Sequence, residues 1–465
     1  MQPSKQLLPS LSAMSLLRTS VDRVGTVGTI PGGTRIDHWE PEDQTFWSEI
    51  GRPVAYRNLG WSICTEFLGF VVWQLWSVVA VLLPKAGFAL TTAETFWLIS
   101  VPSLVGATMR FPYTFLVARF GGRTWTVVSA LLLLIPTIGL AVVVGHPQTP
   151  FPVLLIIAAL SGLGGGNFAS SMANITYFFP IREKGWALGL NAAGGNLGAS
   201  VAQFVVPIAV TIGAVGLNLR VAGLLWVPLL LIAAFGARRF MNNLTGARND
   251  AAGTLAAAKE PHLWLLALLY VGTFGSFIGF SGVFPKLIND TFPEFAALPV
   301  GTASVSLAFL GALVGSLARP YGGRLADRLG GARVTAGAFV GMMIGALAIV
   351  ITLPMRSFVI FLGCFLFVFI ATGIGNGSTY RMIPAIFAAR TGGGPVGRHR
   401  KAAAALGLIA AIGAYGGFLV PQILSVSKQA TGGYGGAFLG FAAAYLVLMI
   451  ITVIVYVRGR VEVRS

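Results

Sequence analysis

The chain has 465 residues, of which 55% are hydrophobic and only 10% are charged, and its mean hydropathy is +0.79. Because soluble domains usually carry about 25% charged residues, this composition excludes a soluble globular protein. The formal net charge of +17 does not indicate a nucleic-acid partner, because the lysines and arginines gather in alternate loops between apolar segments. The lipid bilayer is the expected environment.

Twelve apolar segments follow one another along the chain, and a segment of roughly 20 residues is long enough to cross a bilayer as an α-helix. We expect an all-α polytopic membrane protein with spans at residues 59–84, 93–117, 125–145, 151–178, 186–214, 219–237, 262–285, 297–318, 334–354, 357–380, 402–426 and 433–457. Many of the 60 glycines lie inside these segments, where small residues let helix backbones approach closely. A tightly packed helix bundle is therefore predicted.

The basic loops predict the topology. By the positive-inside rule they place both termini in the cytoplasm and require an even number of spans, and we expect a cell (inner) membrane protein. The polar stretch Asn242–Glu260 divides the spans six and six. The predicted division is a cytoplasmic tail at 1–57, a six-helix bundle at 58–240, a cytoplasmic linker at 241–260, a second six-helix bundle at 261–457 and a cytoplasmic tail at 458–465.

The N-terminal tail is rich in Ser, Thr, Pro and Gly, which is typical of a disordered segment. Met1–Ser20 has no compact apolar run and no small-residue cleavage site, so no signal peptide is predicted. The acidic stretch around Trp39 and Trp47 either docks on the bundle or is a solvated segment before the first helix. The sequence leaves these two alternatives open.

The sequence shows no motif for catalysis or for metal binding. Cys64 and Cys364 lie far apart in two predicted spans, and the four histidines show no zinc spacing. We find no nucleophile-base pairing and no nucleotide-binding loop. We therefore expect no enzyme, no metal and no cofactor.

An internal repeat relates the two predicted halves. The end of span two and the end of span eight match at five positions, each separated by 209 residues, namely Gly106, Arg110, Arg119, Gly121 and Gly122 with Gly315, Arg319, Arg328, Gly330 and Gly331. Further matches join span five to span eleven at Ala187–Leu190 and Ala405–Leu408, and the glycine runs of spans four and ten. Because arginine inside a span is rare, two at equivalent places indicate a duplication.

Duplicated six-helix halves around a midplane site resemble the major facilitator superfamily. The stretch from Gly323 to Gly330 is similar to the loop signature of that superfamily, which latches the halves on the cytoplasmic side. Asp327, Arg328 and the equivalent Arg119 are the predicted latch residues.

Arg110 and Arg319 are the residues most indicative of function. Each could snorkel to the cytoplasmic edge, but separate arginines already mark the adjacent loops, which favours two buried side chains. No carboxylate lies near either one in its own span, so together they form an excess positive site. A planar guanidinium suits a small planar oxyanion better than a lysine would.

Longer motifs resemble the nitrate/nitrite porter family, the NarK-like branch of the superfamily. The similarity lies in the glycine-rich run from Gly162 to Asn174, in the run from Ala187 to Gly198, in the tail segment 36–59 and in span seven from Thr273 to Ser281. It covers roughly residues 36–457. The family implies that nitrate and nitrite are the transported partners.

The resemblance also implies roles for single residues. Arg110 and Arg319 would clamp the anion, Phe168, Tyr270 and Phe274 would sandwich it, and Asn196 would contribute a polar contact. Residues of the signature and of the sliding helix contacts would be Gly164, Gly165, Gly166, Asn167, Asn191, Gly194, Gly195, Gly375, Gly377, Gly413 and Gly416. From the residues alone, core packing remains the alternative for each aromatic side chain.

The coupling mode stays open in the sequence. Two arginines with one bound monoanion leave a cationic site that returns poorly when empty, which favours exchange of nitrate for nitrite. Glu66 in span one favours the alternative, a proton-coupled nitrate symporter, unless it is a structural partner of an arginine at the cytoplasmic edge. A nitrate-sensing receptor is a more distant alternative. The sequence does not set the oligomeric state, and a monomer is our working expectation.

Overall fold

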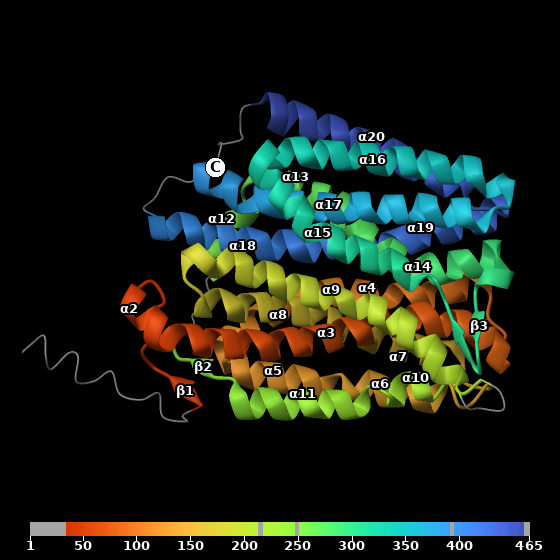
Figure 1. Cartoon of the computed structure of the whole chain (residues 1–465), viewed down its shortest axis with the longest axis horizontal. Coiled ribbons are helices and arrows are strands. Elements are labelled where there is room, and N and C mark those ends of the chain that lie inside the picture. Colours follow the sequence, from red (N-terminus) through yellow and green to blue (C-terminus); the bar gives the residue numbers. More distant parts are fainter. Residues whose placement is uncertain (1–33, 213–216, 247–250, 391–394, 460–465) are drawn as a thin grey trace, which may run out of the picture.

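The computed structural model describes residues 34–212, 217–246, 251–390 and 395–459, and helices dominate it (Figure 1). The first half contains the helices Gln44–Phe46 (α2), Trp47–Gly51 (η1), Arg52–Leu82 (α3), Leu83–Ala86 (η2), Thr92–Phe120 (α4), Gly122–Leu132 (α5), Leu134–Val143 (α6), Phe151–Ser161 (α7), Leu163–Phe178 (α8), Ile181–Thr211 (α9), Val221–Leu224 (α10) and Val227–Phe240 (α11).

The second half follows the short helix Ala251–Ala258 (α12). Its helices are Pro261–Tyr270 (α13), Val271–Gly275 (η3), Ser276–Thr291 (α14), Pro293–Phe295 (η4), Phe309–Leu329 (α15), Gly331–Thr352 (α16), Leu353–Met355 (η5), Phe358–Arg390 (α17), Pro395–Ala414 (α18), Gly416–Thr431 (α19), Gly435–Ile451 (α20) and Thr452–Arg458 (η6). Two short sheets complete the fold, with strands Arg35–Ile36 (β1), Asn243–Leu244 (β2), Leu298–Val300 (β3) and Ala303–Val305 (β4).

The spans are helical because a helix satisfies its backbone hydrogen bonds internally, as lipid requires. Ten helical stretches of the described chain are long and apolar enough to cross a membrane. The two other long helices are α4, with 29 residues, and α15, with 21, and each carries a buried arginine. Together they give the twelve spans predicted from the sequence, so the all-α architecture is confirmed.

The two halves form two layers in Figure 1, with α3 to α11 below and α13 to α20 above. We call the end with α2, β1 and β2 the linker end, and the end with β3 and β4 the hairpin end. Two of the polar contacts between the halves join residues of α9 and α19 to the facing half. Gln203 on α9 donates to the Ser281 carbonyl (2.5 Å), and Gln422 on α19 donates to the Ser100 hydroxyl (2.7 Å).

The hairpin corrects the predicted start of span eight. Residues 298–305, expected to be helical, form the antiparallel pair β3 and β4 with a turn at Gly301 (φ +62°), and the helix begins only at Phe309. The Ser304 amide donates to the Thr211 hydroxyl (2.9 Å), so the hairpin joins the second half to the end of α9. The helix α15 continues through Pro320 to Leu329, so Arg319 lies inside a continuous helix.

The end of the N-terminal tail docks at the linker end. β1 pairs in parallel with β2 of the predicted linker, Trp39 donates to the Phe178 carbonyl (3.2 Å), and Trp47 donates to Glu183 (2.7 Å). Docking of this segment is thus confirmed, and the solvated alternative is wrong for it. The expectation of no signal peptide within Met1–Ser20 falls outside the described residues. The first span starts at Gln44, well before the predicted residue 59.

Candidate functional site

Arg110 lies in the interior of the bundle. It is 1% exposed, so the snorkelling alternative is wrong for it. Its Nε donates to the Gly165 carbonyl on α8 (3.2 Å), and its Nη1 crosses to the second half and donates to the Ala410 carbonyl on α18 (2.7 Å). Its buried Nη2 has no hydrogen-bond partner among the described residues. Arg110 therefore touches both halves and keeps one donor unused.

Aromatic rings surround the Arg110 guanidinium. Its central carbon lies 4.5 Å from the ring centroid of Phe168, 5.2 Å from that of Phe274 and 5.5 Å from that of Trp73. Phe168 and Phe274 are stacked with centroids 6.4 Å apart. The structure thus brings together two of the predicted aromatic residues, one from each half. It adds Trp73 of α3, which the sequence prediction missed.

Arg319 is the equivalent residue of the second half and is 6% exposed. Its guanidinium carbon lies 5.3 Å from the ring centroid of Tyr380 on α17, and its buried Nη1 has no partner within the described part of the chain. Its positive charge is close enough to that of Arg110 for the two to repel each other. Both predicted arginines are therefore buried, one in each half.

Tyr270 links the two arginine environments. Its ring stacks on Phe274 at 5.2 Å and lies 6.1 Å from the ring of Tyr380. Its hydroxyl donates to Asn376 Oδ1 on α17 (2.9 Å). Sequence reasoning missed Asn376 and Tyr380, although Asn376 stands within the glycine run of span ten that matches the run of span four.

Two asparagines of the first half are buried without compensation. Asn196 is 0% exposed and Asn167 is 2% exposed, and neither side chain finds a hydrogen-bond partner among the described residues. A buried polar group in that condition costs about 1–3 kcal/mol. A polar ligand would relieve this cost, which is consistent with the role predicted for Asn196.

Glu66 is the one carboxylate that sequence reasoning placed inside a span. Its Oε2 accepts hydrogen bonds from the Ser171 hydroxyl on α8 and the Asn191 amide on α9, and the residue is 1% exposed. The helix that carries Glu66 starts earlier than predicted, so Glu66 lies near the middle of the helical stretch Gln44–Ala86. The hydrogen-bond partners of Glu66 are neutral side chains, and the alternative of an arginine partner at the cytoplasmic edge is not observed among the described residues.

The predicted glycines lie where helices touch. A Cβ on Gly164 would approach the Gly69 carbonyl oxygen to 2.1 Å, and one on Gly377 would approach the Arg319 carbonyl oxygen to 2.1 Å. A Cβ would come closer than 3.0 Å to another heavy atom at every one of Gly164, Gly165, Gly166, Gly194, Gly195, Gly375, Gly377, Gly413 and Gly416. A side chain larger than hydrogen at any of these positions would therefore require a neighbouring backbone or side chain to shift.

The predicted latch takes a different form. Asp327 on α15 accepts from Arg381 Nε on α17 (2.5 Å), so this ion pair joins two helices of the second half. Neither Arg119 nor Arg328 forms an ion pair among the described residues. Arg381 does lie beside the first half, since its Nη1 is 3.6 Å from where a Cβ on Gly185 would be. The pairing of Asp327 across the halves is not observed.

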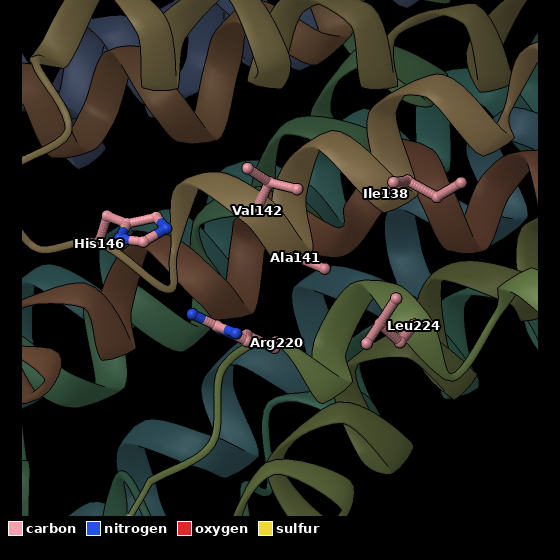
Figure 2. A pocket seen from close by; sticks show the side chains of 6 residues that line it. All are labelled: Ile138, Ala141, Val142, His146, Arg220 and Leu224. Atoms are coloured by element: carbon pink, nitrogen blue, oxygen red, sulfur yellow. The ribbon is translucent and has the colours of Figure 1, made fainter.

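A partly open pocket of about 210 Å³ lies beside α6 and α10, and neither Arg110 nor Arg319 lines it (Figure 2). It is lined by Ile138, Ala141, Val142, His146, Arg220 and Leu224 from α6, α10 and the residues next to them. Ile138, Val142 and Leu224 are among the exposed apolar residues of the bundle. Among the residues described, no three His, Cys, Asp or Glu side chains gather into a metal-binding group.

Comparison with known proteins finds a matching family profile and similar chains over most of the sequence. The family profile described as Major Facilitator Superfamily matches residues 65–421. The chain is 42% identical over 450 residues to the nitrate/nitrite transporter NarU of Escherichia coli strain K12, covering 91% of this chain and 96% of that one. It is 37% identical to the probable nitrate/nitrite antiporter NarK2 of Thermus thermophilus, covering 89% and 94%.

Solved structures show the same fold at low sequence identity. A bacterial homolog of the human lysosomal transporter Spinster, in an inward-facing and occupied conformation, superposes with a TM-score of 0.61 at 17% identity and covers 88% of this chain and 97% of that one. A point mutant of the nucleoside transporter NupG superposes with a TM-score of 0.60 at 14% identity, covering 86% and 100%.

Proposed function

The chain belongs to the NarK-like nitrate/nitrite porters of the major facilitator superfamily, and from this we propose that it moves nitrate inward and nitrite outward by alternating access. The observation that carries the proposal is the buried pair Arg110 and Arg319, one from each half, among stacked aromatic rings. A small planar anion bound there neutralises part of an otherwise costly charge.

The two arginines belong to different halves, and this explains how one half could rock against the other around a bound anion. Because each half supplies one arginine, an anion bound between them attracts both halves and releases when they separate on one side. The glycine contacts within each half keep that half compact during the motion. One chain supplies both arginines, so a monomer suffices for transport, and no catalytic chemistry is required.

The basic loops give the orientation. They place the linker end and both termini at the cytoplasmic face of the cell membrane. The hairpin end then faces outward, where hydrogen bonds of Gln203, Gln422 and the Ser304 amide join the two halves. The hydrogen bond from Arg110 to the Ala410 carbonyl also joins them at the level of the site.

Exchange is favoured by the charge of the site. The two buried arginines give the empty site an excess of positive charge, and a bound monoanion offsets one of these charges. The empty carrier therefore crosses the low-dielectric barrier less readily than the loaded one. Nitrate symport with a proton is the second candidate, because protonation of Glu66 could accompany binding of the anion.

Uptake of labelled nitrate into proteoliposomes tests both candidates. The four conditions combine the presence or absence of internal nitrite with the presence or absence of an inward proton gradient. Exchange predicts uptake that requires internal nitrite and ignores the gradient. Gradient-driven uptake into liposomes without nitrite would replace exchange by symport, and no nitrate uptake under any condition would refute the proposed transport.

A further inference from the structure

The second half holds a polar cluster beside Arg319 in which three buried polar atoms have no hydrogen-bond partner among the described residues. Asn376 on α17 is 0% exposed, and its Nδ2 has no partner among the described residues. The buried hydroxyl oxygen of Tyr380, one turn further along α17, and the buried Nη1 of Arg319 likewise have none there. Buried donors are normally satisfied, so three in one place require an explanation.

Tyr270 positions this cluster. Its hydroxyl donates to Asn376 Oδ1 (2.9 Å), which occupies the acceptor end of the amide and leaves the Nδ2 end as the unused donor. The Tyr380 ring lies 5.3 Å from the Arg319 guanidinium carbon and 6.1 Å from the ring of Tyr270. The cluster is therefore one connected group around Arg319.

Each arginine has one buried nitrogen without a hydrogen-bond partner among the described residues, namely Nη2 of Arg110 and Nη1 of Arg319. Arg110 donates from its Nε and Nη1 to the carbonyl oxygens of Gly165 and Ala410. In the internal repeat, the glycine run containing Gly165 matches the run containing Asn376. Where the first half satisfies its arginine with a backbone carbonyl, the second half thus presents an amide donor.

We propose that Asn376 and Tyr380 bind oxygen atoms of the anion held at Arg319 and thereby set the preference between nitrate and nitrite. This rests on the proposed nitrate/nitrite transport. Nitrate spreads its charge over three oxygens and nitrite over two, so a site with donors from several residues favours the anion that has more acceptors. Removing one donor should weaken nitrate more than nitrite.

Two substitutions test the assignment in proteoliposomes by measuring the KM for each anion. Tyr380→Phe removes only the hydroxyl, and Asn376→Leu removes the amide at similar volume. The loss of one hydrogen bond corresponds to roughly a tenfold rise in the nitrate KM. We expect a smaller rise for nitrite, so the ratio of the two KM values should change. Tyr445→Phe is the matched control, because Tyr445 is a buried tyrosine of the second half whose hydroxyl is hydrogen-bonded to that of Ser276 (2.8 Å).

The outcomes are distinct. A changed KM ratio in Tyr380→Phe, with the ratio of Tyr445→Phe unchanged, supports the assignment even if Asn376→Leu fails to fold. Wild-type exchange combined with an unchanged ratio in Tyr380→Phe and in a folded Asn376→Leu overturns it while leaving the proposed transport intact. A wild-type protein that moves neither anion overturns the transport itself and this assignment with it.

Discussion

Replacing Arg110 by lysine should separate the planar guanidinium from the positive charge. The guanidinium donates to carbonyl oxygens on α8 and α18 at 3.2 and 2.7 Å, and its Nη2 has no partner in the described part of the chain. A lysine ammonium is a single point and cannot reach both carbonyls and an anion. The loss of one charged hydrogen bond costs about 1.5–3 kcal/mol, which corresponds to roughly a 10- to 100-fold loss in anion capture.

The assay is nitrate uptake into proteoliposomes loaded with nitrite, measured over a range of nitrate concentrations. Arg119→Lys is the matched control, because Arg119 lies on the same helix but is exposed and forms no ion pair among the described residues. The control should behave as wild type. If Arg110→Lys protein folds and keeps the wild-type kcat/KM for nitrate, the planar fork is unnecessary and the reasoning fails.

Three further predictions concern coupling, packing and the docked tail. Glu66→Gln should remove any dependence of nitrate uptake on external pH. It should spare exchange, because an amide oxygen can still accept the hydrogen bonds that Ser171 and Asn191 donate to the carboxylate. Persistent pH dependence would exclude Glu66 as the coupling group. Gly416→Ala should destabilise the protein by roughly 1–3 kcal/mol and so lower its Tm in detergent, because the new Cβ would lie 2.4 Å from the Gly275 Cα. The control Gly407→Ala should keep the wild-type Tm, because its Cβ meets no atom within 4 Å. Equal Tm values for the two variants would contradict this. Trp47→Phe loses the 2.7 Å hydrogen bond to the carboxylate at the start of α9 and should speed proteolysis before the first span, and an unchanged cleavage rate would show that this bond does not hold the tail.

The sequence predicted the central features for physical reasons that are local. A charged side chain in an apolar segment is expensive, so Arg110 and Arg319 stood out, and the repeat made their equivalence visible. The length and hydropathy of the apolar runs indicated twelve helices. Phe168, Tyr270 and Phe274 followed from the family resemblance, and the structure places all three near the arginines.

Other features depend on contacts between distant segments, which local patterns do not encode. The start of span eight was wrong because residues 298–305 are apolar enough for a helix but pair as strands around the turn at Gly301. The burial of Glu66 depends on where the first helix starts and on side chains of α8 and α9. The hydrogen bond from Arg110 to Ala410 joins residues 300 positions apart, and no periodicity predicts it.

That hydrogen bond bears on how the carrier moves. Arg110 belongs to the first half and Ala410 to the second, so separation of the halves at this level breaks the bond and frees a second donor of the same guanidinium. A charged donor without a partner is costly in a low-dielectric interior, and an anion is the group that can replace the carbonyl. Opening therefore costs less free energy in the loaded protein than in the empty protein. The same residue that captures the anion thus opposes the return of the empty carrier, as exchange requires.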